Sequence, residues 1–110
     1  MDPNKLARDT ARGLTVWAVM KVLSRGPTHG YALMKELQAS GLTHLKSGTI
    51  YPLLHRLQTE GAVDAEWDHH QTGPAKKVFT LSNSGIKDLE AVERELFQII
   101  RDISEGEAND

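Results

Sequence analysis

The 110-residue sequence predicts one small, mainly helical domain with a single β-hairpin, followed by a long C-terminal helix. Three observations predict this fold class. Apolar residues recur at helical spacing in three successive segments, strand-like alternation then flanks a Gly-Pro turn, and a helical apolar stripe continues almost to the end of the chain. A chain of this length buries a modest core by itself, which leaves room for help from a partner chain.

The composition is that of an ordinary globular protein, with 39% hydrophobic residues, 25% charged residues and no cysteine. No apolar run reaches the roughly 20 residues of a membrane span, and residues 1–13 lack the apolar part of a signal peptide. We therefore expect a soluble, cytoplasmic protein. The net charge of −2 is divided unevenly: residues 1–81 carry ten Lys or Arg against seven Asp or Glu, whereas residues 82–110 carry three against eight. An anionic partner is expected at the first part.

The first helix is predicted over residues 14–23, where only two polar residues interrupt an apolar run. A helix that is apolar nearly all round must be covered on more than one side. Gly26-Pro27 ends this segment, and a second helix is predicted over residues 31–40, before Gly41.

The third helix has a core stripe with i, i+3, i+4 and i+7 spacing: Ile50, Leu53, Leu54 and Leu57. Gly61 ends this helix. Proline lacks the N–H that a helix interior requires, so Pro52 predicts either a helix start near Thr49 or a tolerated kink.

The opposite face of the third helix has little bulk at its front. Its members are Gly48, Pro52, His55 and Thr59, with Tyr51 and Arg56 at the edges. A phosphate or a base edge can approach such a face closely, and the free N–H groups of the helix start attract anions beside Lys46, Ser47 and Thr49. The alternative is that the two hydroxyls only cap the helix.

Residues 63–68 alternate between apolar and acidic side chains, and after a Gly-Pro turn residues 76–81 return as a second strand. This pattern predicts a hairpin. Lys76 and Lys77 form a basic pair near its tip, where a hairpin could meet a phosphate backbone, although two lysines at a turn also serve solubility alone.

The last helix begins at a cap, Ser82 or Ser84, and is predicted to run to about Ser104. Its apolar stripe follows a 3-4 spacing: Leu89, Val92, Leu96, Ile99 and Ile103. One small chain has too few elements to cover both this stripe and the first helix, so we expect a homodimer whose interface includes Leu14, Trp17 and the stripe. The alternative is that the last helix folds back on its own domain.

Three helices followed by a hairpin are in the order of a winged helix-turn-helix, whose third helix enters the major groove of DNA while the hairpin lies on the backbone. We therefore divide the chain into a winged-helix DNA-binding domain with an N-terminal arm, residues 1–81, and a C-terminal dimerisation helix with a frayed tail, residues 82–110. A two-fold dimer would read half-sites about 10 base pairs apart.

Three segments resemble, in order and spacing, signature segments of the PadR family of bacterial transcriptional regulators: GPTHGYALMKEL, SGTIYPLLHRLQTEGAV and GPAKKVFTLSNSG. With one C-terminal helix, the chain resembles the short PadR subfamily. The resemblance implies a homodimeric regulator, usually a repressor on a pseudo-palindromic operator. The resemblance implies DNA contacts by these residues: His29, Gly30, Tyr31, Ser47, Thr49, Tyr51, His55, Arg56, Lys76 and Lys77. Lys46 joins them because of its place at the start of the third helix.

Two positions depart from the family pattern. Val78-Phe79 stands where the family usually has two tyrosines, and Leu96 stands where some members place a tryptophan against a flat aromatic drug. A small aromatic effector could still stack on Trp17 in a cavity at the dimer interface, with Leu96 and Ile100 as further contacts. The alternative is that Trp17 belongs to the core.

Other functional classes are not favoured. The sequence has no Gly-rich phosphate loop, nucleophile motif or close carboxylate pair, so we expect neither an enzyme nor a cofactor. Five histidines without a cysteine would need distant carboxylates to hold a metal, so no metal site is expected. The alternative function is a dimeric winged-helix module that binds protein without specific DNA binding, and the salt dependence of DNA affinity separates the two.

Overall fold

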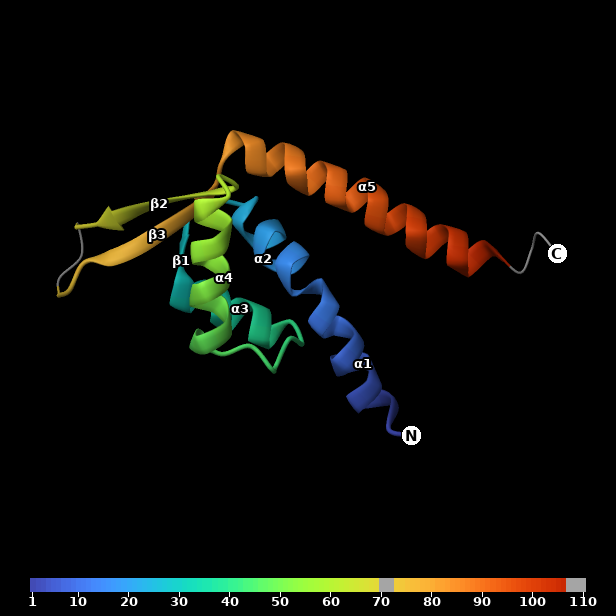
Figure 1. Ribbon diagram of the computed structural model, residues 1–110. Helices are drawn as coiled ribbons and strands as arrows, with labels where there is room; N and C mark the ends of the chain where they lie inside the picture. Colours follow the sequence, from blue (N-terminus) through green and yellow to red (C-terminus); the bar gives the residue numbers. More distant parts are fainter. Residues whose placement is uncertain (70–72, 107–110) are drawn as a thin grey trace.

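The computed structural model describes residues 1–69 and 73–106. In chain order the elements are helix α1 (Pro3–Ala11), the 3-10 turn η1 (Arg12–Leu14), α2 (Thr15–Leu23), β1 (Thr28–His29), α3 (Gly30–Ala39), α4 (Ser47–Thr59), β2 (Val63–Asp68), β3 (Lys76–Leu81) and α5 (Asn83–Glu105) (Figure 1). The predicted fold class is confirmed. The expected frayed tail falls largely on residues 107–110, which lie outside the described part of the chain.

Helix α4 begins at Ser47, which is earlier than the predicted start near Thr49. Lys46 occupies the cap position in an extended conformation, and Pro52 lies inside the helix. The start near Thr49 is therefore wrong, and the tolerated proline is correct. Because Pro52 has no N–H, it cannot donate the usual helix hydrogen bond to the Gly48 carbonyl. That carbonyl lies on the exposed first turn of α4, where water can reach it.

The predicted hairpin is confirmed, and a further strand joins it. Within the described residues, β1, β3 and β2 form one antiparallel sheet in that order. Thr28 pairs with Phe79 and His29 with Val78. The sequence did not predict β1, because two residues are too few to show alternation.

The core lies where α2, α3 and α4 meet the base of the sheet. Its largest fully buried side chains come from all of these elements and from the loop before α4: Val19, Leu23, Leu33, Leu45, Ile50, Leu54 and Val63. Helix α2 is covered by α3, the sheet and α5, as its nearly all-round apolar surface requires.

The base of α5 belongs to this same core. Ser82 caps the helix by accepting the Gly85 N–H at 3.0 Å, and its hydroxyl donates to the Gly61 carbonyl at 2.6 Å. A Cβ on Gly85 would collide with the Ala62 carbonyl. Leu89 is only 4% exposed and packs in the domain core, so its predicted place in the dimer interface is wrong.

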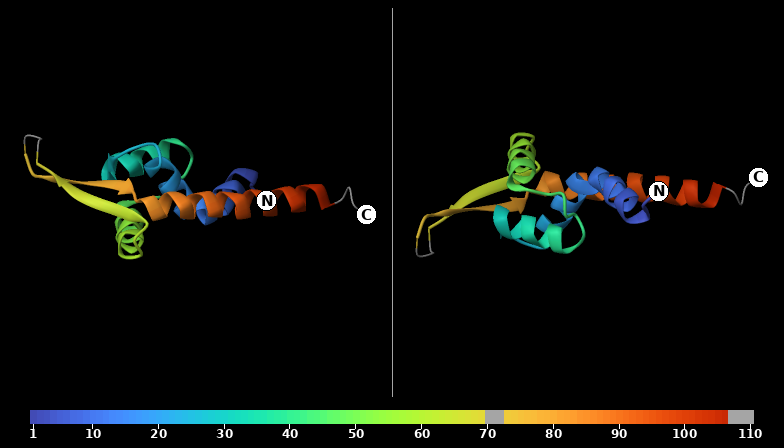
Figure 2. Two further views of the ribbon diagram at one scale, coloured as in Figure 1. Left: turned by 90° about the horizontal axis from the view of Figure 1, so that it is seen from above. Right: turned by 90° about the horizontal axis from the view of Figure 1, so that it is seen from below.

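Two helices leave the body on the side opposite the hairpin (Figures 1 and 2). One is the distal part of α5. The other is α1, which replaces the expected polar arm; Asp2 caps it by accepting the Asn4 N–H at 3.0 Å, and Pro3 holds the first helical position. The Cα radius of gyration is 16.3 Å, compared with about 13 Å for a compact chain of this length. No helix in residues 1–69 and 73–106 is long and apolar enough to cross a membrane.

Candidate nucleic-acid interface

Helix α4 presents the predicted polar face to solvent. Ile50, Leu54 and Leu57 are buried, whereas the opposite residues are all exposed: Gly48, Pro52, His55 and Thr59, with Tyr51 and Arg56 at the edges. The packing of the core therefore directs this face outward. In Figure 2, α4 projects from the body on its own.

The start of α4 carries donors and positive potential. The N–H groups of Thr49 and Ile50 donate to the Lys46 carbonyl at 2.9 and 3.0 Å, so those of Ser47 and Gly48 precede the helical ladder. Because the cap position belongs to Lys46, the hydroxyls of Ser47 and Thr49 are not at the cap, contrary to the capping alternative. The side chains of Lys46, Ser47 and Thr49 are exposed around this helix end. Such an end binds anions.

Tyr51 is placed by Gly30. A Cβ on Gly30 would lie 2.6 Å from Cε1 of the Tyr51 ring, and Gly30 is buried beneath that ring. The predicted DNA contact by Gly30 is therefore wrong, because its role is to leave space for Tyr51. The Tyr51 side chain remains 43% exposed beside the recognition face.

Tyr31 and His29 lie near the start of α3. Tyr31 is exposed, and the Lys35 ammonium lies 5.4 Å from its ring centre. His29 is half-buried and points toward the hairpin, where its Nε2 lies 3.9 Å from Asp68 Oδ2. His29 therefore connects the base of α3 with the hairpin.

Arg56 is exposed and lies 3.9 Å from Glu60, one turn further along α4. An exposed ion pair of this kind is weak, so Arg56 can exchange it for a phosphate. Beside Arg56 a hollow of about 550 Å³ separates α4 from η1 and the start of α2. Arg12 and His44 also line this hollow, and Thr15 Oγ lies 3.4 Å from His44 Nε2. The sequence did not predict these two residues, since η1 and the loop before α4 show no periodic pattern.

The hairpin carries the predicted basic pair. Lys76 pairs across the ladder with Asp68, and Lys77 pairs with Trp67. The Lys77 ammonium lies 5.9 Å from the Trp67 ring centre and 5.8 Å from the Phe79 ring centre. Trp67 did not appear among the predicted contacts, because strand alternation places it on the core face and only the ladder register shows that it lies opposite Lys77.

The α5 stripe remains uncovered beyond its base. Leu96 is half-buried, and the exposed apolar residues of this part are Val92, Phe97, Ile99, Ile100 and Ile103. The contacts with α2 use other positions of α5: the Trp17 and Phe97 rings meet edge to face at 6.4 Å, and Lys21 pairs with Glu93 at 3.0 Å. Trp17 and Leu14 are half-buried.

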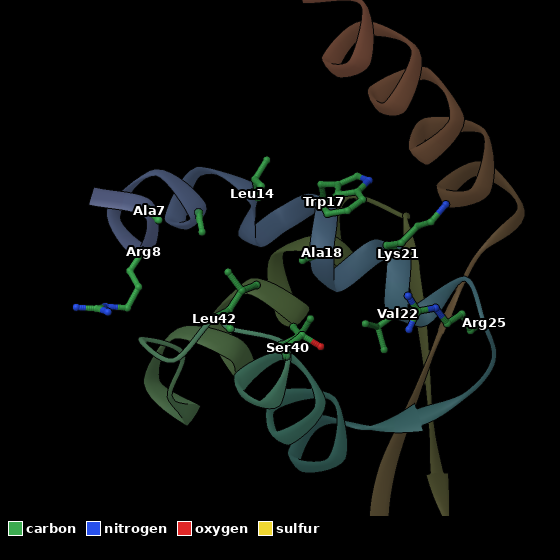
Figure 3. A pocket seen from close by; sticks show the side chains of 13 residues that line it. Ala7, Arg8, Leu14, Trp17, Ala18, Lys21, Val22, Arg25, Ser40 and Leu42 are labelled. Atoms are coloured by element: carbon green, nitrogen blue, oxygen red, sulfur yellow. The ribbon is translucent and has the colours of Figure 1, made fainter. Parts of the chain in front are cut away.

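A groove of about 430 Å³ runs along one side of Trp17 (Figure 3). Its walls come from α1, η1, α2 and the end of α3: Ala7, Arg8, Ala11, Leu14, Trp17, Ala18, Lys21, Val22, Arg25, Leu37, Ser40, Gly41 and Leu42. Leu96 and Ile100 lie on α5, outside this lining. The predicted effector set of Trp17, Leu96 and Ile100 is therefore not brought together in this groove.

A metal was not expected from the sequence. In the part of the chain that the structure describes, no three His, Cys, Asp or Glu side chains gather closely enough to hold a metal ion. His70, one of the five histidines considered, lies outside that part.

Helices α3 and α4 with the hairpin form a winged helix-turn-helix, and the exposed polar face of α4 beside a basic wing defines a DNA-binding protein. The chain belongs to the PadR family: residues 19–91 match the model of the transcriptional regulator PadR-like family. The resemblance inferred from the three sequence segments is thereby confirmed. The protein is a transcriptional regulator that binds DNA and is not an enzyme.

Relatives with names and structures support this assignment. The chain is 31% identical to the transcriptional regulator Rv3488 of Mycobacterium tuberculosis over 81 residues, and this matched segment covers 74% of each protein. The crystal structure of a PadR family transcriptional regulator from Eggerthella lenta is 27% identical with a TM-score of 0.84, over 96% of this chain and 92% of that one. A PadR-like regulator from Bacillus cereus, 24% identical with a TM-score of 0.78 over 87% and 93% of the two chains, shares the fold.

Proposed function

We propose that the protein is a ligand-responsive repressor that binds a pseudo-palindromic operator as a homodimer. The observation that carries the DNA-binding part is the exposed face of α4, with the anion-attracting start at Lys46 and Ser47 and the basic wing beside it. The residues proposed to contact DNA are His29, Tyr31, Lys46, Ser47, Thr49, Tyr51, His55, Arg56, Lys76 and Lys77. Arg12 and His44 add positive and hydrogen-bonding groups beside Arg56.

The homodimer is supported by the uncovered part of α5. Ile99, Ile100 and Ile103 are 53%, 51% and 75% exposed, although each is a large apolar side chain on one helix. Val92, Leu96, Ile99 and Ile103 share one stripe, and Glu93, which contacts α2, lies about 100° round the helix from Val92. The exposed part of the stripe therefore faces to one side of the α2 contact, where α5 of a second copy can pair with it.

The ligand response is proposed for the groove beside Trp17. Its volume lies within the range of small-molecule pockets, which is about 300–1,000 Å³, and its walls are mainly apolar with Arg8 and Arg25 at the edge. A flat aromatic anion fits this combination of an indole, aliphatic walls and cations.

The operator test is a fluorescence anisotropy titration of labelled duplex from the protein's own promoter, with a scrambled duplex alongside. Arg56→Ala should weaken operator binding by about tenfold or more, because it removes a charged contact at the edge of the recognition face. Arg94→Ala on α5, which removes the same charge far from the wing, is the control. Equal affinity for operator and scrambled duplex at low salt would favour the protein-interaction module instead.

The wing provides a second operator test. Lys76→Ala with Lys77→Ala should weaken binding to every duplex and lower the slope of log affinity against log salt by about one or more, because fewer counterions are released. An unchanged slope would show that the wing does not touch the DNA.

The groove test uses 1-anilinonaphthalene-8-sulfonate, a fluorescent aromatic anion, with the Trp67→Phe variant, in which Trp17 is the single tryptophan. Binding should quench Trp17 emission. Ala7→Arg places a long side chain over the groove from an exposed helix position and should abolish the quenching, whereas Ala32→Arg on exposed α3 should not. Equal quenching in both variants would place the anion elsewhere.

A further inference from the structure

Trp67 is an exposed tryptophan on the wing. Its side chain is 59% exposed. On β3 the residue opposite Trp67 is Lys77, and two residues after Lys77 the aromatic ring of Phe79 is only 3% exposed. Tryptophan is highly buried on average, because its large apolar ring gains most from leaving water. An indole held in solvent on a DNA-binding element therefore calls for a partner.

The ladder register places Trp67 and Lys77 on one face of the wing. Val63, Ala65 and Trp67 alternate along β2, and their partners on β3 are Leu81, Phe79 and Lys77. Val63 and Phe79 are buried against the helices, so this face is the continuation of the core face beyond the edge of the body. At the end of this face nearest the hairpin tip, Trp67 and Lys77 form an aromatic and basic pair.

The other face of the wing is acidic. Asp64, Glu66 and Asp68 alternate along it, and Lys76 lies on it directly across from Asp68. Asp64 and Glu66 are exposed on this face and repel a phosphate backbone, whereas Asp68 is half-buried and lies 3.9 Å from His29. The two lysines of the wing are therefore not equivalent: Lys77 stands on the face that an anion can approach.

Lys77 is held beside the ring before any DNA arrives. Its ammonium lies 5.9 Å from the Trp67 ring centre and 5.8 Å from that of Phe79, both within cation–π range. The side chain is half-buried. Because its rotamers are already restricted, less conformational entropy is lost when it meets a phosphate.

We propose that Trp67 and Lys77 form a wing contact with the DNA backbone, in which the indole packs on a deoxyribose at the edge of the minor groove and Lys77 neutralises the adjacent phosphate. The inference rests on the proposed operator binding. Contacts to sugar and phosphate fix the position of a protein on the duplex without reading its sequence. The wing contact would thus set how α4 lies in the major groove.

The test uses Trp17→Phe, which leaves Trp67 as the single tryptophan. Binding of a fluorescein-labelled promoter duplex is followed by anisotropy, and the exposure of Trp67 is followed separately by acrylamide quenching with unlabelled duplex. Saturating DNA should lower the quenching constant of Trp67 by about half or more, as expected when a stacked ring leaves water. In the matched variant Trp67→Phe, the quenching constant of Trp17 should change little.

Affinity gives an independent readout that does not depend on the Trp17 substitution. Trp67→Ala should weaken binding about tenfold with an unchanged salt slope, because an apolar contact is lost and no charge. Trp67→Phe should recover part of this loss. Lys77→Ala should lower the salt slope by about one, and Lys76→Ala should lower it by less.

Three results would overturn the inference in distinguishable ways. If anisotropy saturates while Trp67 stays as accessible as in the free protein, the wing contact is wrong and operator binding stands. If no duplex raises the anisotropy of either single-tryptophan variant or of the unchanged protein, operator binding itself fails and the wing contact fails with it. A Trp67→Ala variant with native affinity and a lower melting temperature would assign the ring to hairpin stability alone.

Discussion

At the scale of single residues, Gly30 and Gly85 are glycines because a Cβ at either position would collide with a neighbouring group. Backbone conformation is not the reason, since neither has a positive φ. The atom that a Cβ would meet differs between them. At Gly30 it is the far edge of the Tyr51 ring, which can rotate away, whereas at Gly85 it is the backbone carbonyl of Ala62, which accepts the Ser82 N–H at 3.0 Å and cannot move as freely. The first glycine therefore controls a functional side chain, and the second controls how α5 joins the domain.

The two alanine substitutions should consequently differ in kind. Gly85→Ala should lower the free energy of unfolding by about 2–3 kcal/mol, because overpacking against backbone strains the core. Gly30→Ala should lower it by less than about 1 kcal/mol and should weaken operator binding by displacing Tyr51. Urea unfolding and anisotropy measure the two effects, with Gly106→Ala at the far end of α5, where a Cβ meets open space, as the control. A larger stability loss at Gly30 than at Gly85 would contradict this assignment.

At the scale of elements, α5 has two parts with different environments. Its base, capped by Ser82 and packed through Leu89, belongs to the winged-helix domain, whereas the part beyond Glu93 keeps an apolar stripe in solvent. The boundary proposed at residue 82 therefore marks the start of a helix and not the edge of a core. One helix connects the domain core to the proposed dimer interface, so movement of α5 would change the position of the wing domain.

Ile103→Glu tests the proposed interface, because it places a charge on the most exposed position of the stripe. The dimer dissociation constant should rise by about 100-fold or more, since an unpaired charge would be buried on association. Sedimentation equilibrium measures the change. Gln98→Glu adds the same charge on the polar side of α5 and should leave the dimer intact. A dimer that tolerates Ile103→Glu would place the interface elsewhere.

At the scale of the whole molecule, the chain is elongated, with extents of 61 × 34 × 20 Å, and the wing and the α5 stripe lie toward opposite ends (Figure 1). This separation lets one surface bind DNA while the other pairs with a second copy. The charge distribution agrees with it, because the positive excess lies in residues 1–81 and the negative excess in residues 82–110. The acidic part is thereby kept away from the phosphates.

A dimer of this kind should be sensitive to operator spacing. Inserting 5 base pairs between half-sites should lower affinity by about 100-fold toward that of a single half-site, because about half a helical turn moves the second site to the opposite face of the DNA. Anisotropy titrations on the natural and lengthened duplexes measure this, with five substitutions outside the half-sites as the control. Equal affinities would mean that the two recognition helices bind independently.

The sequence by itself determined the order of the three core helices, the hairpin and the last helix, as well as the outward face of α4 and the family. Each of these depends on periodicity within one element or on a short motif, because the alternation of apolar and polar residues records which side of that element is buried. Ile50, Leu54 and Leu57 were placed correctly for this reason. The cap of α5 was narrowed to Ser82 or Ser84, and the structure shows that it is Ser82.

Only the tertiary structure decided which elements cover one another. The assignment of Leu89 to its own core, the packing of Tyr51 on Gly30 and the pairing of β1 with β3 all join residues far apart in the chain. The exposure of Trp67 has the same origin: its alternation marks the core face of the strand, but the body ends before it. Periodicity shows that a face is apolar, and the three-dimensional arrangement decides whether its own chain reaches far enough to cover it.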